Sequence, residues 1–344
     1  MSFKEKLFDA ALDISKKAAI KAIFDKIFNR YDRPNYDITP GLINIERTNL
    51  IREDIYFDSN GYKLKGYYYP NNSDKLIIIC HGLRSGADDY IPFINYFINN
   101  GFECFSFNYK GTYESEGDKT FGMSESLVDL DNAIRYINKN YKNKKIYLFG
   151  HSWGGFAVCA VLNIHKNIKA VASISGFDDA SSIIVDKGVS FGGELAAYPK
   201  KYIDWYQEIT FGNYLKYNAT NGINNSLKTN ILIAHGSFDL IISFKDQSIL
   251  SKANSFINNN VLYYIGEKEN KGHESILYSK EALEYQKIVK REIKLLKGDS
   301  LHEYIKNVDH YKYNDVNKEL FKRIIDLFNK CAWCAFFSWL KKKW

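Results

Sequence analysis

The segment "KIYLFGHSWGGFAVCAVLNIH", residues 145–165, decides the fold class because its pattern changes at a single serine. The apolar run over 146–150 is typical of a buried strand, and the residues after Ser152 continue as a helix. A G-x-S-x-G pattern between strand and helix is typical of a nucleophile elbow, a strained turn that lifts the serine hydroxyl above the sheet. Gly150 and Gly154 are needed there because a side chain would collide with the neighbouring strand or helix. We expect Ser152 to be a nucleophile, although glycine and serine also form ordinary turns.

Further apolar runs on both sides of this segment predict the rest of the sheet. They are "KLIIICHG" (75–82), "GFECFSFNY" (101–109), "IKAVASISG" (168–176), "NILIAHGS" (230–237) and "NVLYYIG" (260–266). Such continuous runs, mostly separated by segments long enough for helical crossovers, indicate a mostly parallel sheet with helices on both faces. Upstream, Asn60-Gly61 within "EDIYFDSNGYKLKGYYYP" (53–70) predicts a hairpin. The fold class is therefore α/β.

Departures from this alternation suggest the domain organisation. Residues 1–50 begin with an amphipathic helix over 4–29, which the prolines and glycine of "YDRPNYDITPG" (31–41) end. Residues 51–176 and 229–297 form the predicted core. Between them, 177–228 is far longer than a crossover needs and is interpreted as an inserted lid. Residues 298–344 form a C-terminal helical extension with a wide apolar stripe.

Composition excludes several classes of function. Apolar residues make up 45% and charged residues 25% of the chain, as in ordinary globular proteins. The net charge of +7 is scattered, so we expect no nucleic-acid partner. An odd count of five cysteines, the absence of a secretory signal and the absence of a long apolar span favour a cytoplasmic protein. "CAWC" (331–334) lies within a helical pattern and is interpreted as packing cysteines, so no metal is expected.

A nucleophilic serine needs a base, and the chain has seven histidines to weigh. His273 lies in "GEKENKGHES" (266–275), just past the last strand, where active sites of open α/β sheets collect. His151 lies on the tight turn before the serine, and His165 lies at the far end of the following helix. His81 and His235 each end an apolar strand in a His-Gly pair, where local turn geometry is the natural role, and His302 and His310 belong to the C-terminal extension. We therefore predict His273 as the base.

The base needs an orienting carboxylate, and Asp239 follows the preceding strand in "ILIAHGSFDLII" (231–242). The order serine, acid, histidine is the one this architecture imposes. Nearer to His273 in sequence are three alternatives on a polar loop, Glu267, Glu269 and Glu274.

Two backbone amides should form an oxyanion hole. We predict those of Trp153, directly after the nucleophile, and of Leu83, where Gly82 lets the chain turn inward. Arg84 on the same loop is a candidate for binding a substrate anion, although an exposed arginine is more often only solvated. Lid aromatics, Trp205 and Tyr206 among them, suit an acyl group or simply pack the lid on the body.

These motifs together resemble the α/β-hydrolase superfamily, in its monoglyceride-lipase-like and serine-aminopeptidase-like branch of bacterial esterases. The resemblance rests on "LIIICHG", "FNYKGTYESEG", "GHSWGG", "HGSFDLI" and "KGHE" and spans Glu53 to Lys297. It implies a serine hydrolase with a lid after the sixth strand. Tyr113, a further candidate substrate contact, stands where such relatives usually have a small residue or histidine. Both terminal helices exceed the minimal fold.

We therefore expect hydrolysis of a carboxylic ester or thioester of a small acyl substrate through an acyl-enzyme, with no cofactor. The same triad could instead transfer the acyl group or cleave a peptide, and a non-catalytic membrane-associated module is a further alternative. The lysine-bearing ends, including "CAWCAFFSWLKKKW" (331–344), could contact a membrane or a second copy, or pack on the body.

Overall fold

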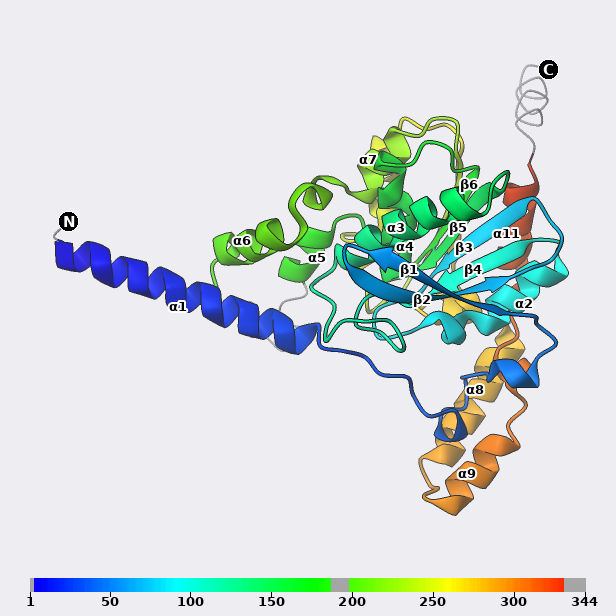
Figure 1. The fold of residues 1–344 in the computed structure, drawn as a ribbon. Coiled ribbons are helices and arrows are strands. Elements are labelled where there is room, and N and C mark those ends of the chain that lie inside the picture. The colour runs from blue at the N-terminus through cyan, green and yellow to red at the C-terminus, as the bar shows by residue number, and fades with distance from the viewer. Residues whose placement is uncertain (1–2, 187–197, 331–344) are drawn as a thin grey trace.

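A computed structural model describes residues 3–186 and 198–330 (Figure 1). The strands are β1 (Glu53–Ser59), β2 (Tyr62–Tyr69), β3 (Lys75–Cys80), β4 (Glu103–Phe107), β5 (Lys145–His151), β6 (Ala170–Ile174), β7 (Asn230–Gly236) and β8 (Val261–Gly266). The helices are α1 (Phe3–Ile27), α2 (Ile91–Asn99), α3 (Glu125–Asn140), α4 (Trp153–Ala160), α5 (Ala180–Asp186), α6 (Lys200–Phe211), α7 (Ala219–Asn224), α8 (Lys280–Ile293), α9 (Asp299–Lys306), α10 (His310–Tyr313) and α11 (Lys318–Asn329).

The strands form one sheet in the order β1-β2-β4-β3-β5-β6-β7-β8. β1 and β2 pair antiparallel as the hairpin predicted at Asn60-Gly61, β2 pairs antiparallel with β4, and the strands from β4 to β8 are parallel. The predicted α/β class with a mostly parallel sheet is confirmed. The carboxyl ends of the parallel strands meet at one edge, where the site forms.

Helices cover both faces of the sheet, and adjacent strand residues face opposite sides. On one face Ile78 and Leu148 pack with α3, α4 and α7. On the other face Ile77 and Phe149 pack with α2 and α11. A strand between two helical layers is apolar at successive positions, which explains the continuous runs in the sequence.

The C-terminal helices do not separate from the core at residue 298, where the sequence predicted the boundary. α11 lies on the sheet, with Leu320, Phe321 and Ile324 fully buried in the same cluster as the strands. α8, which precedes that boundary, forms a separate small cluster around Val289, Val308 and Tyr313, to one side of the body (Figure 1). The part of the apolar stripe that lies on α11 therefore belongs to the core. Residues 331–344, with the two cysteines of the CAWC motif, lie outside the described residues.

The N-terminal helix forms as predicted, but it is not amphipathic along its length. Its last turns, with Ile20 and Phe24, are buried in the main core. Its first turns project from the body (Figure 1) and leave Leu7, Phe8 and Ile14 each more than 60% exposed. The apolar residues face in several directions, which corrects the expectation of one continuous apolar face.

The predicted lid region contains α5, α6 and α7, with residues 187–197 outside the described part. α6 packs against α1, where the rings of Phe24 and Tyr206 have centroids 4.2 Å apart. α7 packs instead against α4 in the layer on the sheet. The described part of 177–228 therefore divides, because α7 belongs to the helical layer on the sheet while α6 contacts α1. Among the described residues, no helix combines the length and apolar character required to cross a membrane.

Candidate active site

Ser152 is the single residue between the end of β5 and the start of α4, at the sharp turn that the sequence predicted. Its φ of 57° and ψ of −112° lie where residues with a side chain are strained. A Cβ on Gly150 would lie 2.2 Å from the Gly154 carbonyl oxygen, and one on Gly154 would lie 2.1 Å from the Cys80 carbonyl oxygen. Both glycines are thus required by close approach, the first to the following helix and the second to the neighbouring strand.

The structure brings Ser152, His273 and Asp239 together in one hydrogen-bonded line. His273 Nε2 lies 2.8 Å from Ser152 Oγ, and His273 Nδ1 lies 2.6 Å from Asp239 Oδ2. The acid and the histidine come from the loops after β7 and β8, so parallel strand ends place them beside the elbow. The alternative acids Glu267 and Glu269 do not contact His273, and the Glu274 side chain is 68% exposed and approaches His151 instead.

Besides His273, three other donors bind the Asp239 carboxylate. Its Oδ1 accepts hydrogen bonds from the backbone N–H groups of Ile241 and Ile242 at 2.8 and 2.9 Å. Its Oδ2 lies 3.1 Å from Nε2 of the buried His235. Burial alone would raise the pKa of Asp239, but hydrogen bonds from His235, from His273 and from the backbone outweigh it and hold this pKa well below the usual range. The carboxylate therefore stays ionised.

His235 is a site residue that sequence reasoning missed. We assigned it to local turn geometry because it precedes a glycine, and its Nε2 does lie 3.1 Å from the Ile242 carbonyl oxygen. The spacing of four residues to Asp239 was the available signal, since the loop after β7 folds back on the strand end.

The two amides predicted to form the oxyanion hole lie beside the elbow. The backbone N–H groups of Leu83 and Trp153 have no hydrogen-bond acceptor among the described residues. Trp153 N begins α4, so the positive end of the helix dipole points at the same place. A Cβ on Gly82 would lie 3.5 Å from Ser152 Cβ, which shows how closely the Leu83 loop approaches the elbow.

Ser152 and His273 open into a cavity of about 770 Å³. Its described walls are largely apolar, and they include Phe93, Met123, Phe177, Ile183, Leu240, Ile241, Ile242 and Leu277. Lys26 and Ile27, from the last turn of α1, also line it. Sequence reasoning missed these two residues, because no local pattern reports that a helix so far from the elbow packs at the cavity.

Of the four predicted substrate contacts, only Arg84 lines the cavity. Tyr113 is buried beneath Gly86, and its hydroxyl donates to Asp89 at 3.0 Å. Tyr206 packs on Phe24, and the ring of Trp205 lies 5.2 Å from Lys17 Nζ. The two aromatics therefore attach α6 to α1, and neither they nor Tyr113 are among the described residues that line the cavity, so their contact with a substrate stays a prediction.

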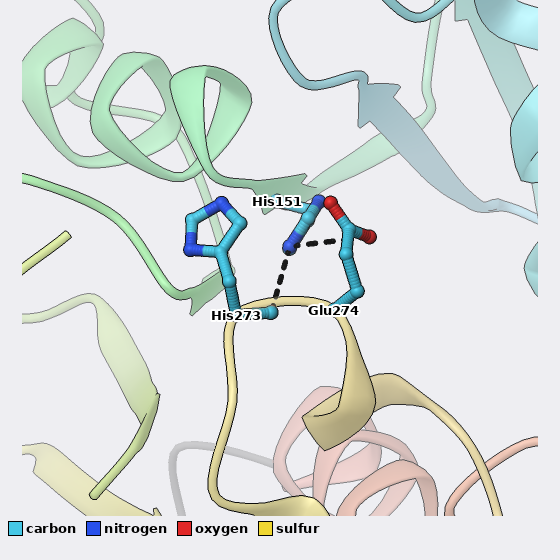
Figure 2. Close-up of side chains that lie close together, drawn as sticks. All are labelled: His151, His273 and Glu274. Carbon is cyan, nitrogen blue, oxygen red and sulfur yellow. Dashed lines mark hydrogen bonds and ion pairs between the residues drawn. The ribbon is translucent and has the colours of Figure 1, made fainter. Parts of the chain in front are cut away.

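One group of metal-ligating types lies at the site, within the part of the chain that the structure describes. His151, His273 and Glu274 bring donor atoms within 4.8 Å of one another (Figure 2). However, His273 uses both ring nitrogens for Ser152 and Asp239, and His151 Nε2 faces the His273 carbonyl at 3.2 Å. That leaves fewer than the three or four protein ligands a zinc site uses. The donor set therefore fits a hydrogen-bond network better than a resident metal.

Comparison with known sequences gives partial matches. Residues 71–185 match the family described as serine aminopeptidase, S33. Protein phosphatase methylesterase 1 of Candida albicans is 23% identical over 184 residues, covering 50% of this chain and 48% of that protein. Quorum-quenching protein AidA of Acinetobacter baumannii is 28% identical over 137 residues, covering 38% of this chain and 45% of that protein. The chain thus spans less than half the length of these curated relatives.

Solved structures share the fold over most of the chain. An esterase of Pyrococcus furiosus, 19% identical, covers 81% of this chain and 98% of its own with a TM-score of 0.54. The α/β hydrolase GrgF of Penicillium sp. sh18, 16% identical, covers 75% of this chain and 100% of its own with a TM-score of 0.52. With the sheet order and the elbow, this likeness shows that the chain has the α/β-hydrolase fold.

Proposed function

We propose that the chain is a carboxylesterase-type hydrolase that cleaves a carboxylic ester or thioester with an apolar acyl group. One observation carries this proposal: Ser152 Oγ lies 2.8 Å from His273 Nε2 and opens into the apolar cavity. The two unpaired amides beside it and the ionised Asp239 behind the histidine supply the other parts that acyl transfer to a serine requires.

In the first half-reaction, Ser152 Oγ attacks the substrate carbonyl carbon while its proton passes to His273 Nε2. The carbonyl oxygen becomes an oxyanion, which the N–H groups of Leu83 and Trp153 stabilise, at about 3 kcal/mol for one such donor. His273 then gives the proton to the leaving alcohol or thiol as the bond to the acyl carbon breaks. This leaves an acyl group on Ser152.

In the second half-reaction, His273 takes a proton from water, whose oxygen attacks the acyl carbon. The carboxylic acid leaves and Ser152 recovers its proton from His273. Throughout, Asp239 accepts a hydrogen bond from Nδ1–H and so keeps Nε2 as the acceptor that faces the serine.

The acyl part of the substrate is inferred from the cavity walls. Met123, Phe177 and Ile183 line it together with Leu240 and Ile242. Burying a methylene group in such walls is worth about 0.8 kcal/mol, so an apolar acyl chain gains affinity with length. The esterase and methylesterase among the similar proteins agree with an ester substrate.

Labelling with a fluorophosphonate probe, together with hydrolysis of p-nitrophenyl esters of increasing chain length, tests this function. We expect the native chain to label and hydrolyse, and Ser152→Ala to do neither. Ser300→Ala, which alters a serine on exposed α9, should behave as the native chain. Labelling that persists in Ser152→Ala would refute the proposal.

The same experiment separates hydrolysis from transfer. Adding glycerol or an amino acid to the ester assay should leave the free carboxylic acid as the main product. A new acyl ester or amide as the main product would assign the enzyme to acyl transfer with the same residues.

A further inference from the structure

A buried hydrogen-bond chain joins the loop of Leu83 to the loop of His273. Gly82 N–H donates to Tyr90 Oη at 2.9 Å, and Tyr90 Oη lies 3.1 Å from His151 Nδ1. On the other side of the same ring, His151 Nε2 lies 3.2 Å from the His273 carbonyl oxygen (Figure 2). Tyr90 and His151, which we call the bridge, are 4% and 2% exposed. Both side chains are thus largely removed from bulk solvent, and both also line the cavity at Ser152.

The donors and acceptors of the bridge fix one tautomer. The His273 carbonyl oxygen can only accept, so the neutral His151 ring carries its proton on Nε2. Its bare Nδ1 then accepts from Tyr90 Oη, which itself accepts from Gly82 N–H. That proton is donated to the His273 carbonyl oxygen. Burial holds the pKa of His151 below its ordinary value, although Glu274 opposes this and Asp239 does so more weakly. The neutral ring therefore satisfies both neighbours.

The two ends of the bridge reach the two loops that must be placed around Ser152. At one end, Gly82 directly precedes Leu83, whose amide is the proposed oxyanion donor. At the other end, the His273 carbonyl also accepts from Ser175 Oγ at 3.1 Å, so the backbone of the base is held by two donors. A Cβ on Gly82 would lie 3.5 Å from Ser152 Cβ and 3.7 Å from His151 Nδ1, so a single methyl group would fill the space between Gly82 and these two side chains.

We propose that Tyr90 and His151 are positioning residues that set the Leu83 amide and the His273 imidazole in one geometry around Ser152. They act through Gly82 and through the His273 backbone. This inference rests on the proposed function of Ser152 and His273. An error of about 1 Å in such a geometry costs up to about 100-fold in rate, so small changes in the bridge are measurable.

A double-mutant cycle tests the bridge, with Tyr90→Phe, His151→Asn and the two combined. The measured quantity is kcat per site titrated with the fluorophosphonate, which separates the rate of competent sites from their number. We expect Tyr90→Phe to lower it about tenfold and His151→Asn by about 10- to 100-fold. Because the two residues form one bridge, kcat per titrated site of the double variant should lie within about threefold of that of the less active single variant.

One further variant at His151 and two control variants sharpen the cycle. His151→Gln, which keeps an N–H near the position of Nε2, should recover part of the activity lost in His151→Asn. If His151→Asn does not fold, Tyr90→Phe paired with His151→Gln carries the cycle. Tyr96→Phe on the same helix α2, and His302→Asn on exposed α9, are the matched controls and should retain the native rate.

Two results would overturn the inference. The first is multiplication of the single effects in the double variant, which would mean independent packing roles. The second is an unchanged rate per titrated site with fewer titrated sites, which would mean that the bridge only supports folding. Failure of the proposed function itself would be seen elsewhere, as persistent labelling of Ser152→Ala.

Discussion

The sheet edge around Ser152 and the helical cover formed by α1 and α6 hold their residues in different ways. At the edge, hydrogen bonds of 2.6 to 2.8 Å fix the positions of single atoms on Asp239, His273 and Ser152. In the cover, ring packing such as that of Phe24 on Tyr206, at 4.2 Å between centroids, fixes whole helices. Directional hydrogen bonds position the reacting atoms, whereas buried rings stabilise the fold. Substitutions at the edge should therefore mainly lower kcat, and substitutions in the cover should mainly lower the free energy of unfolding.

The largest expected effect is at the edge, in Asp239→Asn. The amide offers His273 Nδ1 a donor as readily as an acceptor, so the productive tautomer is lost and kcat should fall by about 10⁴-fold. Urea unfolding should show a much smaller change, because the side chain keeps its shape.

The matched control is Asp246→Asn, on the same connection after β7, whose carboxylate accepts only from Ser243 Oγ among the hydrogen bonds of the described residues. It should retain native kcat. A fall in the free energy of unfolding of Asp239→Asn that accounts for the lost activity would contradict the separation of the two regions.

The next effect in size is in the cover, in Phe24→Ala. Phe24 is 1% exposed in the main core, and removing such a ring costs about 3 kcal/mol in the free energy of unfolding. The rate per titrated site should stay within about threefold of native, because the line from Ser152 to Asp239 does not involve α1.

Phe8→Ala on the same helix is the control, since Phe8 is 68% exposed and its loss should leave the unfolding midpoint unchanged. Equal destabilisation by both substitutions would mean that the first turns of α1 are buried in solution.

The smallest effect concerns Asp131, which links α3 to the segment after α6. Burial would raise the pKa of Asp131, but bonds from His165, Arg135 and Tyr214 lower it to about 2 from 3.8. The stability that this shift supplies, about 2 kcal/mol, is present above about pH 4 and is lost as the pH falls toward 2. Asp131→Asn should therefore be destabilised at pH 7, with the difference from the native chain shrinking below pH 4.

Urea unfolding at pH 7, 5 and 3 measures this, with the exposed Asp326→Asn on α11 as the control. A difference between Asp131→Asn and the native chain that stays constant down to pH 3 would assign the effect to packing rather than charge.

Sequence reasoning predicted the edge better than the cover for a physical reason. The elbow, Asp239 and His273 each follow a strand, and parallel strands bring their carboxyl ends together whatever the helices do. In contrast, the roles of Trp205 and Tyr206 depend on which helix packs against α6. A ring that contacts a substrate and a ring that contacts α1 have the same local pattern, so the sequence left both roles open for these two residues.

By itself, the sequence determined the α/β class and the strained turn at Ser152, together with the acid and histidine candidates. These follow from local patterns, namely continuous apolar runs, glycines at a close approach and polar residues just past strand ends. Only the tertiary structure decided that α11 covers the sheet, that α1 reaches the cavity at Lys26 and Ile27, and that His151 and His235 hold the loops and the acid. These contacts join residues that are distant in sequence or that a loop brings together. A local sequence pattern does not contain this information, because the neighbours come together only when the chain folds.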